Sequence, residues 1–189
     1  MGSILEEIII AGTGGQGVLS AGRLIAYAGM LEGKNVSWLP SYGPEMRGGT
    51  ANCHVTVSEE DIGSPIINKA TAAIIMNAPS LDKFEDMVLP NGRIVLNSSL
   101  MNRKAIREDV KIFELPATEI AIELGNAAYA NIILLGKFIG ETRIVSKESF
   151  ENALKKILPE KKHYLIPKEM EAFNIGWEYN NTYNSTILL

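Results

Sequence analysis

The segment spanning residues 8–17, Ile-Ile-Ile-Ala-Gly-Thr-Gly-Gly-Gln-Gly, constrains the fold of this chain more than any other segment. An apolar run rich in β-branched residues ends in four glycines within six positions, and an Ala- and Leu-rich stretch follows. This order predicts a buried strand, a tight turn and the start of a helix. Glycine allows a positive φ and a close approach to the backbone, and the free N–H groups of a helix start favour an anion. The turn therefore predicts a site for an anion, most often a phosphate.

The spacing of the glycines narrows the kind of anion site. Gly12, Gly14 and Gly17 fit the pattern G-x-G-x-x-G. A P-loop needs Lys and then Ser or Thr after its last glycine, whereas the pair Val-Leu follows Gly17. A dinucleotide site needs a carboxylate at the end of the second strand, and residues 37–40, Ser-Trp-Leu-Pro, supply none. Two interpretations remain, an anion site of another kind or glycines that serve only close packing of helix on sheet.

Length and charge exclude several classes of protein. A chain of 189 residues suits one domain with a sizeable core, and we expect a single domain over residues 1–180 with a short tail at 181–189. The net charge of −4, without a basic cluster, argues against nucleic acid as a partner. No apolar stretch approaches the roughly 20 residues that span a bilayer. Glu6 and Glu7 do not suit a signal peptide, and together with the single cysteine they predict a cytoplasmic protein.

The small number of Cys and His residues limits the metal sites that this chain could form. An iron–sulfur cluster usually takes about four thiolates, and a structural zinc site takes four Cys or His ligands. This sequence offers Cys53, His54 and His163. Cys53 and His54 are adjacent in an apparent strand, so their side chains should point to opposite faces. We expect no metal or cluster bound by this chain, Cys53 in the core or an interface, and both histidines in ordinary polar contacts.

Hydrophobic periodicity predicts alternating strands and helices, which is typical of an α/β domain with a mixed sheet. Residues 50–58 alternate between apolar and polar, which predicts a half-buried strand that is antiparallel or lies at an edge. Gly33 and Gly125 should end helices, Asn126 should cap the next helix, and residues 90–92 should form a turn. The predicted strands are 4–11, 35–39, 50–58, 72–76, 93–97 and 110–115. The predicted helices are 16–31, 79–87, 116–124, 127–139, 147–158 and 167–179.

A second polar segment follows the strand predicted at 35–39. Residues 40–49 contain two prolines and three glycines, which indicates a loop of defined shape. Arg47 could bind a phosphate or carboxylate through its guanidinium, Glu45 could orient it, and Tyr42 offers a flat face with a hydroxyl. If strand 35–39 runs parallel to the first strand, this loop and the glycine turn open on the same edge of the sheet, where ligands of α/β proteins bind. The alternative is a rigid surface turn with a solvated Glu45–Arg47 pair.

Three separate blocks carry a resemblance to a known family over about residues 4–178. They are Gly-Thr-Gly-Gly-Gln-Gly-Val at 12–18 with Ala-Gly at 21–22, Pro-Ser-Tyr-Gly-Pro-Glu-Met-Arg-Gly-Gly-Thr at 40–50, and Leu-Pro-Ala-Thr-Glu-Ile-Ala at 115–121 with Glu-Leu-Gly-Asn at 123–126 and Ala-Asn at 130–131. In these blocks the chain resembles the gamma subunit of 2-oxoacid:ferredoxin oxidoreductases. The second block looks more like the 2-oxoglutarate and branched-chain 2-oxoacid enzymes than like the pyruvate or indolepyruvate enzymes.

The resemblance implies a three-layer Rossmann-like α/β domain with a mixed, mainly parallel sheet. It implies a subunit of a complex that oxidatively decarboxylates a 2-oxoacid, forms acyl-CoA and reduces ferredoxin. Alpha and beta subunits would carry thiamine diphosphate and magnesium, and a delta subunit often carries [4Fe–4S] clusters. The chain would be inactive alone and could form a homodimer when isolated.

For this chain the resemblance implies a part in seating coenzyme A. The ligand residues would be the turn (Gly12, Thr13, Gly14, Gly15, Gln16 and Gly17) together with Ser41, Tyr42, Arg47 and Asn126. No residue of this chain would be catalytic. The alternative is an assembly subunit that binds no ligand, in which the loop at 40–49 contacts the thiamine subunits and the glycines serve packing.

Overall fold

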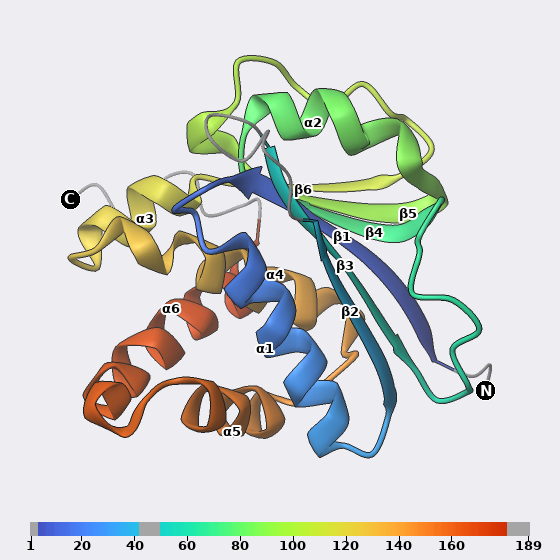
Figure 1. The fold of residues 1–189 in the computed structure, drawn as a ribbon. Coiled ribbons are helices and arrows are strands. Elements are labelled where there is room, and N and C mark those ends of the chain that lie inside the picture. The colour runs from blue at the N-terminus through green and yellow to red at the C-terminus, as the bar shows by residue number, and fades with distance from the viewer. Residues whose placement is uncertain (1–3, 42–49, 181–189) are drawn as a thin grey trace.

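The computed structural model describes residues 4–41 and 50–180, which build one six-stranded sheet with helices on both faces (Figure 1). The strands are β1 (Leu5–Thr13), β2 (Asn35–Ser41), β3 (Thr50–Ser58), β4 (Ala70–Ile75), β5 (Val88–Asn97) and β6 (Lys111–Leu115). The helices are α1 (Val18–Leu31), α2 (Ala78–Phe84), α3 (Ala117–Glu123), α4 (Ala130–Thr142), α5 (Lys147–Ile157) and α6 (Ile166–Glu178). Each predicted strand and helix is present; the ends of β3 are as predicted, and those of the other elements differ at one end or both.

The strand order is β2-β3-β1-β4-β5-β6, and only β3 runs against the others. The prediction of a mixed, mainly parallel sheet is therefore confirmed. The strand at 50–58 is antiparallel as predicted, but it lies between β1 and β2 and not at an edge. β2 consequently points the same way as β1, so both strands end on the same edge of the sheet.

The sheet separates two clusters of buried apolar side chains. On one face α1 and α4 lie directly against the strands, α5 packs on α1, and α6 packs on α4 (Figure 1). On the other face α2 covers the middle of the sheet (Figure 1). The molecule thus has the predicted three layers, with α5 and α6 outside the helices that contact the sheet.

The strand predicted to be half-buried is covered more completely than its sequence pattern suggested. Its apolar residues face α1, and its polar residues Asn52 and Thr56 are also buried. The segment between β3 and β4 covers the polar face of β3. Its residue Ile67 is buried, and the Ile67 N–H lies 3.3 Å from His54 Nδ1. The alternation of apolar and polar residues therefore identified the two faces of β3 correctly. It could not reveal that the connection between β3 and β4 buries the polar face, because this connection has no hydrophobic periodicity.

Helix α1 approaches the sheet closely at its glycines. A Cβ on Gly22 would come within 3.0 Å of Trp38 Nε1 and 3.1 Å of Val55 Cγ2. A Cβ on Gly29 would lie 2.9 Å from Val36 Cγ1. These contacts leave no room for a larger side chain without displacing the helix.

The prediction of a turn at residues 90–92 was wrong, because strand β5 runs through this segment. The pairing with β4 jumps from Ala70↔Val88 to Ala72↔Arg93, so the residues between them bulge out of the ladder. Asn91 takes a φ of 64° there. The Pro-Asn-Gly composition correctly marked a backbone irregularity, but bulges and turns use the same residue types. The predicted helix stops at Gly33 and Gly125 are confirmed, with φ values of 73° and 100°.

Cys53 and the two histidines take the structural roles that were predicted. Cys53 is fully buried, its Sγ lies 3.5 Å from the carbonyl oxygen of Val18, and burial raises its pKa to about 12. His54 points to the opposite face and accepts the Ile67 N–H, and burial lowers its pKa. His163 Nε2 lies 3.0 Å from the carbonyl oxygen of Leu158. A thiol with so high a pKa carries almost no thiolate at neutral pH, which argues against a reactive cysteine.

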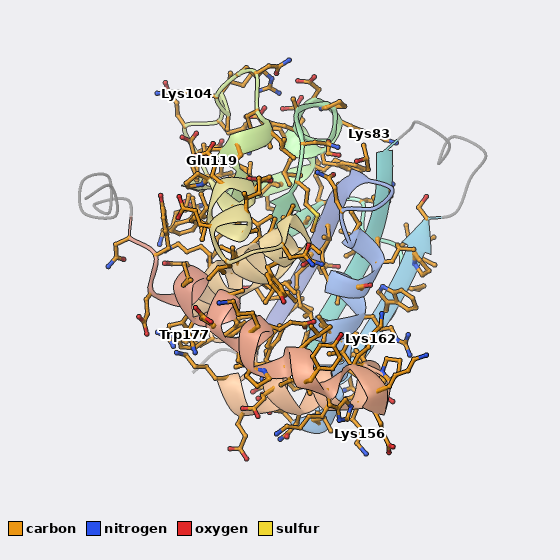
Figure 2. The ribbon with its side chains drawn as sticks, turned by 90° about the vertical axis from the view of Figure 1, so that its left-hand side faces the viewer. Lys83, Lys104, Glu119, Lys156, Lys162 and Trp177 are labelled. Carbon is orange, nitrogen blue, oxygen red and sulfur yellow. The ribbon has the colours of Figure 1, made fainter. Side chains whose placement is uncertain are left out.

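Helices α4 and α6 pack against each other through glycines. A Cβ on Gly176 of α6 would collide with the backbone carbonyl of Ile133 in α4 and lie 3.0 Å from Lys137 N. Gly136 makes the reciprocal contact with the carbonyl of Phe173. Trp177, the next residue along α6, is labelled in Figure 2. Its ring lies beneath the guanidinium of Arg143, 3.8 Å from ring centroid to Cζ.

The Gly176→Ala substitution should therefore destabilise the protein by about 2–3 kcal/mol, because the added methyl group forces α4 and α6 apart. The matched control is Gly140→Ala, whose Cβ would lie 3.1 Å from the carbonyl oxygen of Trp177. That change should alter stability by less than about 1 kcal/mol, since alanine also favours helix. Urea unfolding followed by circular dichroism measures both, and equal effects of the two substitutions would contradict the packing argument.

Glu32, at the end of α1, joins this helix to the start of α5. Its carboxylate pairs with Lys34 Nζ at 2.8 Å and accepts the Ser146 N–H at 2.6 Å. Partial burial alone would raise its pKa, but the hydrogen bonds from Lys34, Ser146 and Ser149 outweigh this and lower the pKa to about 2.

Because the pKa of Glu32 is lower in the folded state, its contribution to stability should be complete above about pH 4.5 and lost as the pH falls toward 2. Glu32→Gln should remove on the order of 2 kcal/mol at pH 7 and flatten the dependence of stability on pH in this range. Urea unfolding at several pH values checks this, with Glu108→Gln at an exposed position as the control. A pH dependence equal to that of the unmodified protein would disprove the role of Glu32.

Candidate ligand-binding site

A pocket of about 250 Å³ opens at the carboxyl edge of the parallel strands. It lies between the turn after β1, the ends of β4 and β5, and the starts of α3 and α4. Within residues 4–41 and 50–180, every residue that lines it is uncharged. Figure 2, which looks from the left-hand side of Figure 1, brings the α3 wall of this region toward the viewer, where Glu119 is labelled. The polar residues of the lining are Gln16, Asn97, Thr118 and Asn131.

The side chain of Gln16 forms hydrogen bonds across the glycine turn. Gln16 Oε1 accepts hydrogen bonds from the Thr13 N–H at 2.7 Å, the Thr13 hydroxyl at 3.1 Å and Asn77 Nδ2 at 3.3 Å. Gln16 Nε2 donates to the carbonyl oxygen of Met76 at 3.3 Å. The turn is thereby tied to the residues that follow β4, and the Thr13 amide is already occupied. A ligand anion would have to use the amides that follow this residue.

The glycines of the turn divide into two kinds. A Cβ on Gly12 would lie 3.0 Å from both Met76 Cβ and Val18 Cγ2, and Gly17 has a φ of 75° with Asn131 in the position of its missing Cβ. These two glycines serve close packing. Gly15 has a φ of 93° with nothing within 4 Å of its missing Cβ, and Gly14 is exposed. Close packing therefore accounts for Gly12 and Gly17, while the anion-site interpretation of Gly14 and Gly15 stays a prediction.

The start of α1 is joined to α4 by Asn131. Gly17 caps α1 in a left-handed conformation, and no side chain of the described residues caps this helix. Asn131 Nδ2 donates to the carbonyl oxygen of Gly17 at 3.3 Å. Asn131 is 8 % exposed, and within the described chain its Oδ1 has no hydrogen-bond partner. A buried acceptor without a partner is costly, so this oxygen marks a place where a donor is expected.

The opposite wall holds a second polar pair. Asn97, which ends β5, is 2 % exposed. Its Nδ2 donates to Thr118 Oγ1 at 2.8 Å, and its Oδ1 accepts the Thr118 N–H at 3.2 Å. This reciprocal pair satisfies Asn97 and fixes the start of α3 against the sheet. Because Thr118 Oγ1 accepts from Asn97, its own hydrogen remains available to a ligand.

The structure brings together part of the predicted site. Gly15 and Gln16 line the pocket, and Gly12, Thr13, Gly14 and Gly17 form the same turn. Asn126 caps the start of the next helical segment as predicted, accepting the Ala128 N–H at 2.9 Å, and it is exposed beside the pocket residues Ala127 and Ala128. Whether Asn126 also contacts a ligand stays a prediction.

Of the second predicted site segment, the structure describes Ser41. Ser41 ends β2 on the same edge as the turn, and it is exposed. The pairings Ala11↔Asn52 and Ser41↔Asn52 set Ser41 two strands from β1, or about 10 Å. Tyr42 and Arg47 lie outside the described residues, so their place in the site stays a prediction.

Sequence reasoning named Gly15 and Gln16 and missed the other lining residues, among them Met76, Asn97, Thr118 and Asn131. Two of them had a usable signal, because an asparagine ends the apolar strand at 93–97 and another begins the apolar helix at 130–139. A polar side chain at the buried end of an apolar element points to the edge where ligands bind. Met76 and Thr118 offered no such signal.

Two searches for other kinds of site gave negative results over residues 4–41 and 50–180. No three or more His, Cys, Asp and Glu side chains are grouped there as ligands of a metal ion. None of the helices in these ranges combines the length and the apolar composition that crossing a membrane requires.

The fold is that of an α/β protein with a pocket at the carboxyl edge of a mainly parallel sheet. Residues 7–179 match the family model described as pyruvate ferredoxin/flavodoxin oxidoreductase, and the chain belongs to this family.

Curated relatives and a solved structure agree with this membership. The chain is 34% identical over 176 residues to the 2-oxoglutarate synthase subunit KorC of Methanocaldococcus jannaschii, covering 92% of each chain. It is 43% identical over 151 residues to the ketoisovalerate oxidoreductase subunit VorA of Methanothermobacter thermautotrophicus, covering 79% of this chain and 31% of VorA. The chain thus spans about a third of the length of the VorA proteins that it matches. The crystal structure of the keto/oxoacid ferredoxin oxidoreductase gamma subunit from Geobacter sulfurreducens superposes with a TM-score of 0.79 at 28% identity, covering 92% of this chain and 96% of that one.

The Gln16→Ala substitution should destabilise the protein by about 1–3 kcal/mol, because it leaves the Thr13 N–H without its acceptor. Gln16→Met removes both the acceptor and the donor while keeping a side chain of similar length, so it should destabilise the protein to a similar extent. Thermal unfolding of the two variants compares them. If the alanine variant were as stable as the unmodified protein, the turn would not depend on this side chain.

Proposed function

We propose that this chain is the gamma subunit of a 2-oxoacid:ferredoxin oxidoreductase, which oxidatively decarboxylates a 2-oxoacid to acyl-CoA and CO₂ and reduces ferredoxin. The membership of the family and the near-complete coverage of KorC and of the Geobacter gamma subunit support this proposal. The proposal assigns thiamine diphosphate, magnesium and [4Fe–4S] clusters to alpha, beta and delta subunits, and it places the complex in the cytoplasm.

Within that complex we assign to this chain a part in seating coenzyme A. The observation that carries the proposal is the pocket at the glycine turn, beside the start of α1, which no side chain of the described residues caps. A helix start attracts a phosphate through its amides and its dipole. The lining residues that the structure describes are uncharged, which supports a part in positioning the ligand.

Charge for the phosphates of coenzyme A would come from Arg47, in the segment after β2. Strand β2, which precedes this segment in the sequence, ends on the edge that carries the turn, because β2 and β1 run in the same direction. A guanidinium binds phosphate with two parallel hydrogen bonds, which also fixes its orientation. Ser41, Tyr42 and Asn126 would line the same region.

We propose 2-oxoglutarate as the substrate of the complex, with a branched-chain 2-oxoacid as the second candidate. The form Ser-Tyr-Gly-Pro-Glu-Met-Arg-Gly-Gly at 41–49 supports both. The coverage of KorC favours the first, while the higher identity to VorA favours the second. Reduction of ferredoxin by the purified complex with each 2-oxoacid, including pyruvate as a third, distinguishes them.

An assembly subunit without a ligand is the competing function. The packing roles of Gly12 and Gly17 support it, because these residues are required by the fold alone. The two functions make different predictions for Gly14, which is exposed. Gly14→Val should weaken coenzyme A binding under the first function and impair only assembly under the second.

Arg47→Ala should raise the KM of the assembled complex for coenzyme A about tenfold and leave decarboxylation of the 2-oxoacid nearly unchanged. The loss of one charge-assisted contact to phosphate accounts for an effect of this size. Initial rates at varied coenzyme A concentration measure the KM, and release of CO₂ with an artificial electron acceptor measures decarboxylation. The matched control is Arg23→Ala, an exposed position on α1.

An unchanged KM for coenzyme A in both Arg47→Ala and Gly14→Val complexes, together with reduced yields of complex, would establish the assembly function instead. A loss of decarboxylation with an unchanged KM would remove Arg47 from the coenzyme A site.

A further inference from the structure

A groove lies at the end of β1 that is farthest from the glycine turn. Its floor consists of the start of β1 and the end of β3, which pair with each other through Leu5↔Ser58 and Glu7↔Thr56. Its wall is the connection from β3 to β4, at residues 60–66. The groove has a volume of about 210 Å³. In Figure 1 this end of β1 is the one beside the letter N, away from α2.

The floor of the groove continues a sheet face that α2 covers only in part. Successive residues of a strand point to opposite faces, so Leu5 and Glu7 lie on the same face as Ile9 and Ala11. The side chains of Ile9 and Ala11 are buried in an apolar cluster with residues of α2. Leu5 and Glu7 lie outside that cluster, and the connection at 60–66 stands beside them.

The groove exposes large apolar side chains. Leu5 in the floor is 50 % exposed, and Ile66 in the wall is 59 % exposed. Ile62, in the same wall, is half-buried. Apolar side chains that gather around an exposed groove are typical of surfaces that bind another protein.

The charges around the groove are all negative within the described chain. Glu7, Glu60 and Asp61 line it, together with uncharged residues. None of the ion pairs between described residues includes these three carboxylates. They also do not form a group that could hold a metal ion. A cation carried by another molecule would therefore be attracted to this groove.

The size and the mixed chemistry of the groove favour a segment of a protein over a small molecule. Sites that enclose a drug-sized ligand have volumes of about 300–1,000 Å³, and this groove is smaller. A lysine or arginine side chain combines an apolar stem with a cationic end, so it suits an apolar floor beside carboxylates. Interfaces between proteins likewise combine an apolar centre with a polar rim.

We infer that the groove formed by residues 5, 7, 56, 58 and 60–66 is the docking site for a basic segment of another subunit of the oxidoreductase complex. An apolar side chain of that segment packs on Leu5 and Ile66, and a lysine or arginine pairs with Glu7, Glu60 or Asp61. The inference rests on the proposed function, because it takes the chain to be a subunit, and it goes further by assigning a face of the domain to one subunit contact.

Crosslinking in the purified complex identifies what occupies the groove. The Ile66→benzoylphenylalanine substitution places a photoreactive group in the wall, and mass spectrometry after irradiation identifies the peptide joined to it. The expected product is a segment of another subunit that contains lysine or arginine. The matched control is Ile106→benzoylphenylalanine, at a position that is 74 % exposed between β5 and β6. It should not crosslink to the same segment.

Matched substitutions measure the apolar and the charged contributions separately. Ile66→Ser and Glu60→Lys should each raise the dissociation constant of this chain from the other subunits about tenfold. The effect of Glu60→Lys should shrink as the salt concentration rises, because exposed charges are screened. Ile106→Ser and Glu108→Lys make the same changes at exposed positions elsewhere and should leave the constant unchanged. Mass photometry over a dilution series gives the constants, and circular dichroism reports whether each variant is folded.

The outcomes separate this inference from the proposed function. A crosslink to a basic segment of another subunit, with greater weakening by the groove substitutions than by their controls, supports the inference. A crosslink to a second copy of this chain or to a segment without lysine and arginine, no crosslink in the intact complex, or equal effects of groove and control substitutions overturns it. In those cases a complex that contains this chain and reduces ferredoxin leaves the proposed function standing. A chain that copurifies with no oxidoreductase subunit overturns the proposed function as well.

Discussion

The contact of the glycine turn with β4 and α4 is the constraint on which the site depends. Gly12 admits Met76 and Val18, the missing side chain of Gly17 leaves room for Asn131, and Gln16 bonds across the turn. A backbone held this closely has few ways to relax, since interiors are packed as densely as organic crystals. The same contacts that stabilise the turn also set the position of the first turn of α1 relative to α4, and the pocket is the space left between them.

Much of the fold could be predicted from the sequence, because the signals for it are local. The apolar run at 8–11 with its glycines predicted strand, turn and helix, and the alternation at 50–58 predicted an antiparallel strand. The place of β3 between β1 and β2 could not be predicted in the same way, since strand order depends on contacts between distant segments. The error at Asn91 has a local cause, because a bulge and a turn both require a backbone that leaves the extended conformation.

The site was predicted less completely than the fold for a related reason. Glycine spacing marked the turn, but the pocket also needs Asn97, Thr118 and Asn131, which come from three other elements. Nothing in the sequence states that the ends of β5, α3 and α4 converge. Gln16 was expected to bind a ligand, which stays a prediction, and the structure adds hydrogen bonds of its side chain to Thr13, Asn77 and Met76 that the sequence did not reveal.

The insertion of one antiparallel strand has a consequence for how such a domain diversifies. β2 and β3 form a hairpin whose two strands are paired up to Ser41 and Asn52, so the ends of their connection are fixed about 5 Å apart by the ladder itself. Lengthening or replacing a connection anchored in this way costs little free energy, because loop-closure entropy changes slowly with length. The residues that connect β2 and β3 can therefore change during evolution while the six strands and the glycine turn are retained.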